Sequence, residues 1–191
     1  NTNGYAAEIG RAGGGVINVI TKSGTNDTHG TAFWFYRDKA LNANTWANNR
    51  LGRAKAPYHF NQFGGNLGGP IVKNKLFYFV DFDGQRNTSP NVTFLQVAPP
   101  ADADSQAAAR ELQPALAPYV QKLDNNVALF KTDWEISGSQ RLSVRYNLNR
   151  FKGANFENGG PASAAEHTGN SNVTTDNVAV HSRLNAAVAA A

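Results

Sequence analysis

The sequence predicts an all-β fold, an antiparallel up-and-down meander that forms part of a transmembrane β-barrel, with one short helix in a long loop. The connections between the predicted strands run long, short, long, short, long, so a meander places every long loop at one end. Outer-membrane barrels have this asymmetry of short turns and long loops. Six segments have strand-forming composition: 29–37, 60–67, 76–86, 127–136, 141–151 and 173–183.

The clearest strand is 141–151. An apolar residue stands at every second position, and polar residues stand between them: Leu142, Val144, Tyr146 and Leu148 against Arg141, Ser143, Arg145 and Asn147. Any half-buried antiparallel sheet alternates in this way. Length separates the possibilities, because roughly 9–11 residues cross a bilayer at a tilt, whereas an ordinary strand has about 5–6.

The strands 127–136 and 141–151 predict a hairpin with its turn at 137–140. Placing Ile136 opposite Leu142 also places Asp133 opposite Arg145, and opposite charges across two strands stabilise the pair. The alternation then predicts one shared face for the charged residues Asp133, Glu135, Arg141 and Arg145.

A helix is predicted at 104–123, inside the longest connection, from its alanines and spaced leucines. Pro114 and Pro118 lie within it, so we expect a broken or kinked helix, since proline lacks the backbone donor that a helix interior needs.

Composition excludes several classes of protein. The 191 residues contain no cysteine, which rules out disulfides and thiolate metal sites. They contain no methionine, so we expect an interior piece of a longer protein. The net charge of +4 is scattered and forms no clustered basic patch, so nucleic acid is not a predicted partner. A modest excess of cations at 37–55 is suited to anionic lipopolysaccharide head groups. No apolar run approaches the roughly 20 residues of a membrane helix.

No motif predicts catalysis, a cofactor or a metal. The four histidines are isolated, and the chain has neither a phosphate-binding loop nor a nucleophile elbow. Asp81 and Asp83 share one strand face, where carboxylates bind a cation or line a wet lumen and pair with Arg or Lys. A hard cation needs more oxygen ligands than these two.

Residues 13–30, GGGVINVITKSGTNDTHG, join a glycine-rich run and a β-branched run to a turn, and an aromatic strand follows. This junction resembles the end of the plug and the first barrel strand of TonB-dependent outer-membrane transporters, closest to the Oar-like receptors. Segments 61–70 and 75–86 resemble the family's next two motifs in the same order. Thr28 departs from the pattern, because the family commonly has an aromatic residue there.

The resemblance implies that 1–28 is the C-terminal end of a plug domain and that 29–191 is the first, incomplete part of the barrel. It implies active import of a scarce solute, such as a siderophore, oligosaccharide or peptide, across the cell outer membrane. Its partners are outer-membrane lipid and lipopolysaccharide, the solute, and TonB through a segment missing here. Expected contacts between plug and barrel in the lumen involve Glu8, Arg11, Asp81, Asp83, Asp133 and Arg145.

The resemblance also predicts that 16–21 packs across the polar face of the sheet and does not continue the meander. Glycines 64, 65, 68 and 69 suit a bulge or a place where the plug backbone passes close.

A different class of protein also fits the alternation, namely a soluble β-sandwich that acts as a carbohydrate-binding or adhesion module. A sandwich would cover the row from Leu142 to Leu148 with a second sheet, whereas a barrel would leave that row facing lipid.

Overall fold

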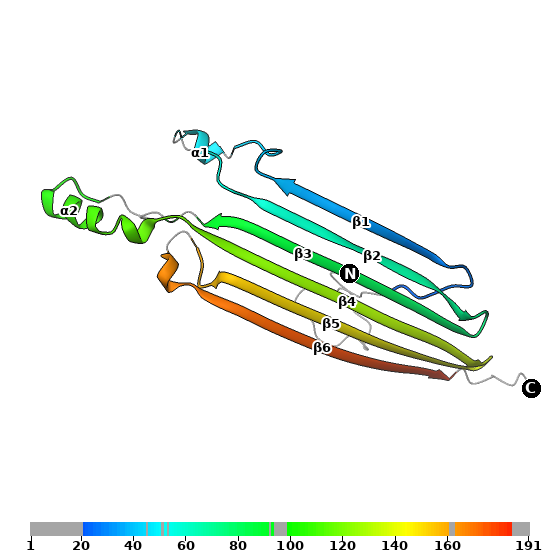
Figure 1. Cartoon of the computed structure of the whole chain (residues 1–191). Helices are drawn as coiled ribbons and strands as arrows, with labels where there is room; N and C mark the ends of the chain where they lie inside the picture. Colours follow the sequence, from blue (N-terminus) through cyan, green and yellow to red (C-terminus); the bar gives the residue numbers. More distant parts are fainter. Residues whose placement is uncertain are drawn as a thin grey trace, which may run out of the picture.

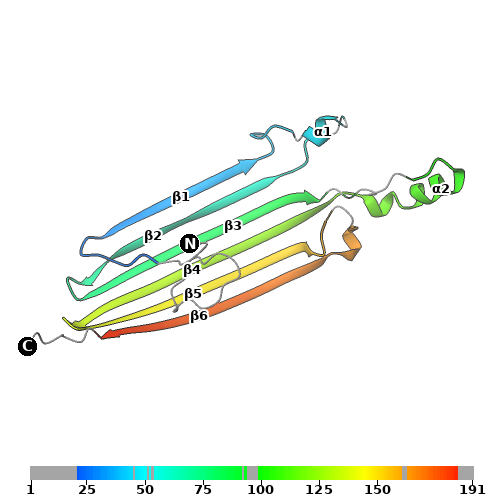
Figure 2. The ribbon, with the colours of Figure 1, turned by 180° about the vertical axis from the view of Figure 1, so that it is seen from behind.

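The structure is a computed structural model that describes residues 21–44, 46–50, 52, 54–91, 93, 99–160 and 163–184. One antiparallel sheet holds six strands in chain order, each paired with the next (Figures 1 and 2). The strands are β1 (His29–Asp38), β2 (His59–Val72), β3 (Leu76–Asn91), β4 (Tyr119–Ser137), β5 (Gln140–Glu157) and β6 (Gly169–Leu184). The predicted all-β meander is confirmed, and the sheet is not closed.

Several strands extend well beyond their predicted bounds, because polar residues continue the pairing past the apolar alternation. β4 has 19 residues and β5 has 18. In the added part, Lys122 pairs with Ala154 and Asp124 with Lys152. These added residues do not alternate between apolar and polar, and that alternation is what predicted the strands. The predicted strands were therefore shorter than the observed ones.

The connections have the predicted asymmetry. Short turns join β2 to β3 and β4 to β5 at one end of the sheet, and the long connections lie at the other end (Figure 1). The long connections hold α1 (Trp46–Arg50), α2 (Ala103–Glu111), η2 (Pro114–Leu116) and η3 (Ala165–His167). Within the described residues, no helix is long and apolar enough to cross a membrane.

The predicted helix 104–123 is wrong in its second half. α2 ends at Glu111, a 3-10 turn follows at Pro114–Leu116, and β4 already begins at Tyr119. Pro114 prevents the helix from continuing because it supplies no backbone donor, and Pro118 lies just before the start of β4. At its start, the Asp102 carboxylate accepts a hydrogen bond of 2.8 Å from the Ser105 backbone N–H. This bond lowers the pKa of Asp102, because it stabilises the charged form.

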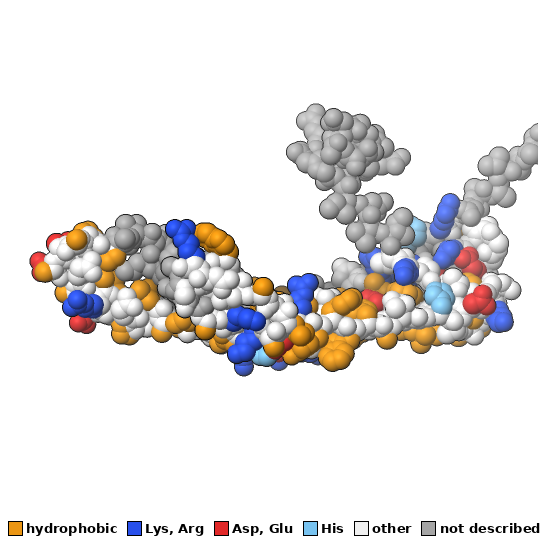
Figure 3. Space-filling view, turned by 90° about the horizontal axis from the view of Figure 1, so that it is seen from above, with side chains coloured by type: hydrophobic (Ala, Val, Ile, Leu, Met, Phe, Trp, Pro, Cys, Tyr) orange, Lys and Arg blue, Asp and Glu red, His pale blue; other side chains and the backbone are white. Residues whose placement is uncertain are grey.

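The register separates the sheet into an apolar and a polar face. Hydrophobic side chains form a band along the apolar face, seen as orange on the lower side of Figure 3. Only Phe79 and Tyr119 are buried hydrophobic residues in the described part, and both lie on the polar face by register. On the apolar face, Val178 and Val180 are 65% and 66% exposed. The band contains Trp34, Phe63, Leu67, Tyr78, Val80, Phe82, Phe130, Trp134, Leu142, Val144, Tyr146, Leu148, Val178 and Val180.

The described residues form a single sheet, so no second sheet covers the row from Leu142 to Leu148. That row is about 20 Å long at the usual rise per residue. Outer-membrane barrels carry an apolar band about 25 Å tall. The uncovered band therefore favours a barrel wall over a sandwich.

The β4–β5 hairpin turns at 137–140 as predicted, but its register differs from the prediction by two residues. Asp133 lies opposite Ser143, Arg145 opposite Lys131, and Trp134 opposite Leu142. A bulge between Glu135 and Ser137, next to the tight turn, sets this register. Because the shift is an even number, every side chain keeps its predicted face.

Candidate functional site

The polar face of the sheet collects the predicted site residues that the structure describes. Asp81, Asp83, Asp133 and Arg145 all fall on this face by their strand register. They do not form one cluster, since Asp81 pairs with Leu129 and Asp83 with Val127, away from the turn end where Asp133 lies. Glu8, Arg11 and most of the predicted 16–21 strand lie outside the described residues.

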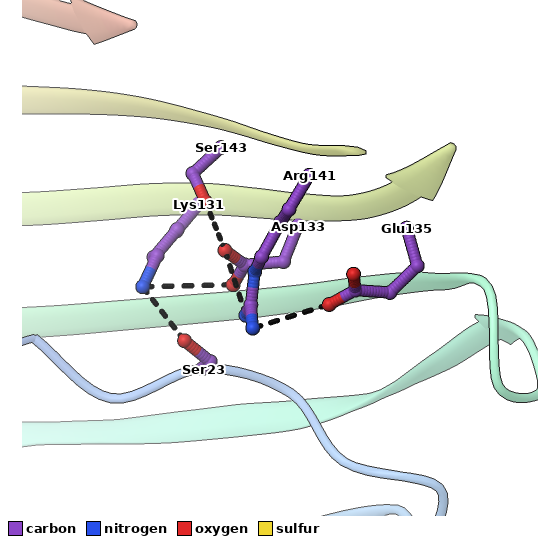
Figure 4. Close-up of polar contacts among 6 residues, drawn as sticks. All are labelled: Ser23, Lys131, Asp133, Glu135, Arg141 and Ser143. Atoms are coloured by element: carbon purple, nitrogen blue, oxygen red, sulfur yellow. Dashed lines mark hydrogen bonds and ion pairs between the residues drawn. The ribbon is translucent and has the colours of Figure 1, made fainter. Parts of the chain in front are cut away.

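Asp133 is the centre of a charged cluster on this face (Figure 4). It is 1% exposed, and the Ser143 hydroxyl donates a hydrogen bond to its carboxylate. Lys131 Nζ lies 3.5 Å and Arg141 Nη2 lies 3.3 Å from the same carboxylate. Arg141 also reaches Glu135 Oε1 at 3.1 Å. Two cations and a hydroxyl thus compensate one buried charge, as burial of a carboxylate requires.

The segment before β1 is attached to this cluster. Lys131 Nζ donates a hydrogen bond of 2.7 Å to Ser23 Oγ, which joins the segment to β4 (Figure 4). Lys131 therefore binds Asp133 of the sheet and Ser23 of the segment at once. The hydrogen bond links residues 108 positions apart in the sequence.

Glycines let the same segment pass close to the sheet. A Cβ atom on Gly24 would lie 2.3 Å from the Tyr78 carbonyl oxygen and 2.7 Å from that of Gly69, and one on Gly68 would lie 3.5 Å from Gly24 Cα. Any side chain at Gly24 would collide with backbone atoms of β2 and β3. Gly68 and Gly69 thus lie where a chain passes close, and a bulge follows between Pro70 and Val72.

The polar face also carries buried polar atoms without partners among the described residues. Gln62 Nε2 donates to Asp83 Oδ2 at 2.7 Å, but Asp83 Oδ1 has no partner. The other such atoms are Asn87 Oδ1, Tyr119 Oη, Asn125 Oδ1 and Arg145 Nε. Every one of them belongs to this face by register. Buried polar atoms normally bind a partner, so this face is suited to a polar occupant.

Sequence patterns alone did not identify Lys131, Ser143 and Ser23 as members of this cluster. Lys131 lies two residues before Asp133 on β4, so the alternation of the strand already placed both side chains on the same face. Ser143 was hidden by the register error, which placed Arg145 opposite Asp133. Ser23 carries no signal in sequence, because only the folded path of its segment brings it to Lys131.

A hollow of about 480 Å³ lies at the long-loop end, between the β1–β2 connection and β3. Its lining includes Arg37, Lys39 and Lys55 and no acidic residue. Lys55 Nζ donates to the carbonyl oxygens of Lys39 and Asn42 at 3.1 and 2.7 Å, which fixes this part of the loop. Among the described residues, no group of three or more His, Cys, Asp or Glu side chains is arranged to hold a metal.

Comparison with known proteins agrees with these features. A family model described as "Outer membrane beta barrel domain" matches residues 20–122. The TonB-dependent transporter Oar of Myxococcus xanthus is 38% identical over an alignment of 85 residues, and the match covers 42% of this chain and 8% of that protein. The chain therefore spans a small part of that relative's length. No solved structure matches the chain.

Proposed function

The chain belongs to the family of outer membrane beta barrel domains and is located in the outer membrane, and on this basis we propose that it is part of a TonB-dependent transporter. The match to Oar confirms the resemblance that the motifs indicated. In this proposal, residues 1–28 end the plug and residues 29–191 begin the barrel wall. The apolar face meets lipid and the polar face lines the lumen.

The attachment of Ser23 and Gly24 to the polar face carries the proposal. This segment lies directly before the first wall strand, and it contacts β2, β3 and β4 on the face that would enclose a plug. A polar lumen filled by a folded plug also accounts for the unpartnered buried atoms of the same face.

The contacts suggest how a plug would be held while it moves. Gly24 fixes the last plug residues by close backbone packing, and the Lys131–Ser23 hydrogen bond adds a polar contact that water can replace. A pull from TonB on an upstream segment would then reach this anchor last, so the plug rearranges and the junction stays in place. The solute would enter at the long-loop end, where the hollow near Arg37, Lys39 and Lys55 lies. The protein acts as a transporter and not as an enzyme.

Uptake by the full-length parent protein tests this proposal. Cells that express the parent should accumulate the solute, and accumulation should stop when TonB is deleted or the proton gradient is collapsed. Persistent accumulation without TonB would contradict active import and favour a passive pore. An adhesin would bind the solute and accumulate none.

A further inference from the structure

The apolar band ends at a straight row of paired residues near the long-loop end. Phe63 pairs with Gly84, Gly84 with Asn126, Asn126 with Arg150, and Arg150 with Thr174. On the turn side of this row, β3 to β5 present hydrophobic side chains almost without interruption. On the loop side, the next two rows on the same face hold Arg86, Asp124 and Lys152, then Thr88, Lys122 and Ala154, so polar and charged side chains predominate there. The row therefore marks the border between hydrocarbon and head groups for a wall that faces lipid.

Four cations follow this border on the apolar face: Arg86, Lys122, Arg150 and Lys152. Arg150 lies in the border row, Arg86 and Lys152 flank Asp124 in the next row, and Lys122 lies in the third. Rows on one face are about 7 Å apart along a strand, so all four lie within about 14 Å of the border. We call these four residues the cationic shelf.

The cationic shelf lies on the apolar face and has no counterpart on the polar face. At the same level, the described residues of β3, β4 and β5 on the polar face include no lysine or arginine. β2 and β6 flank these strands on both sides, so further barrel strands cannot cover the shelf. The shelf therefore remains open toward the membrane surface.

The shelf surrounds a hollow of about 300 Å³ lined by Arg86, Asp124, Asn126, Arg150 and Lys152. Arg86 is held in place, because its Nη1 donates to the Asn125 carbonyl oxygen at 3.1 Å and its Nη2 to Asn126 Oδ1 at 2.8 Å. Arg150 and Lys152 are exposed and form no hydrogen bond or ion pair with another described residue. Two cations without a hydrogen bond or ion pair thus stand beside Arg86, whose Nε lies 3.9 Å from the Asp124 carboxylate.

We propose that the cationic shelf binds the phosphate groups of anionic lipid head groups in the outer leaflet, with Arg150 and Lys152 as the direct ligands. The inference rests on the proposed orientation of the apolar face toward lipid. Cations at this depth meet the layer where lipid phosphates lie, and each contributes to binding of an anionic membrane surface. The hollow opens on the face opposite the polar one, so the lipid site is separate from the solute path.

Native mass spectrometry of the full-length parent in detergent tests the site, with phosphatidylglycerol as the anionic probe and phosphatidylcholine as the neutral one. The double substitution Arg150→Gln/Lys152→Gln should weaken phosphatidylglycerol binding by about 30-fold, the effect expected for two surface cations. The matched control Lys73→Gln/Lys75→Gln removes two cations from the β2–β3 turn and should leave binding at the shelf unchanged. Equal losses in both variants, or equal binding of phosphatidylcholine, would overturn the inference.

Two further measurements separate the possible outcomes. Inorganic phosphate at millimolar concentration should not displace the lipid, and displacement would show a site for free anions instead. Solute uptake by the shelf variant should equal that of the unmodified parent. A parent that binds phosphatidylglycerol through the shelf but accumulates no solute would contradict transport and still support the lipid site.

Discussion

Asp133 is the residue on which the polar face depends most. Its carboxylate is buried beneath Lys131 and Arg141 and accepts a hydrogen bond from Ser143 on the neighbouring strand. Removing one member of a buried charged cluster leaves the remaining charges without compensation. The resulting loss of stability is larger than the net stabilisation that the intact ion pair provides. The carboxylate also orients Lys131 toward the segment that carries Ser23.

Asp133→Asn should therefore destabilise the folded parent by about 2 kcal/mol. Unfolding by urea in detergent micelles measures this loss. Glu135→Gln is the matched control, since the Glu135 side chain is 35% exposed and its pair with Arg141 is partly solvated. That control should cost less than about 1 kcal/mol. Equal losses in the two variants would show that burial of Asp133 has no special role.

Gly24→Ala tests the close passage of the segment before β1. The new methyl group would lie 2.3 Å from the Tyr78 carbonyl oxygen, so the segment must lift away from the sheet. In the Gly24→Ala variant, a Ser23→Cys reporter should then react faster with a thiol reagent than the same reporter does in the protein that keeps Gly24. Gly138→Ala is the control, because nothing lies within 4 Å of its added Cβ. An unchanged labelling rate in Gly24→Ala would contradict the packed arrangement.

At the scale of single elements, β5 shows most directly what each face requires. Val144 lies near the middle of the apolar row, and Asn147 lies on the polar face of the same strand. Val144→Arg should destabilise the protein folded in lipid vesicles by about 2–4 kcal/mol, the usual effect of arginine at the bilayer midplane. Asn147→Arg should change the free energy of unfolding by less than about 1 kcal/mol. Similar losses from both would argue against a lipid-facing row.

Sequence patterns predicted the elements better than their ends or their register. All six strands were recognised, because alternation of apolar and polar residues reports the two faces directly. The pattern lost β4 before Val127, where residues 124–126 are polar on both faces, and it read the strand start at Tyr119 as helix. A bulge places the hairpin register two residues away from the predicted one, and no local sequence pattern indicates this bulge. Asp133 was thus assigned the correct face and the wrong partner.

The candidate site was predictable only in part, for a related reason. Parity along a strand places Asp81, Asp83, Asp133 and Arg145 on one face. Contacts such as Lys131 with Ser23 depend on how a separate segment crosses the sheet. Strand alternation contains no information about such a path, although the paired glycines at 68 and 69 indicated a close passage.

At the scale of the whole molecule, the sheet has two open edges. β1 pairs only with β2, and β6 pairs only with β5, within the described residues. An open edge presents unpaired backbone groups that promote association and that lipid does not tolerate. The purified chain should therefore require detergent or aggregate, as size-exclusion chromatography with and without detergent would measure. A monomeric peak in detergent-free buffer would contradict this expectation.

The strictly sequential pairing of the six strands has a consequence for how the sheet assembles. Every strand finds its partner in the adjacent part of the chain, across connections that range from the two-residue β4–β5 turn to the long loops. The entropy lost on closing a loop grows only slowly with loop length, so even the long connections add little to the barrier. The wall can therefore grow by one hairpin at a time, and each added strand supplies the template for the next.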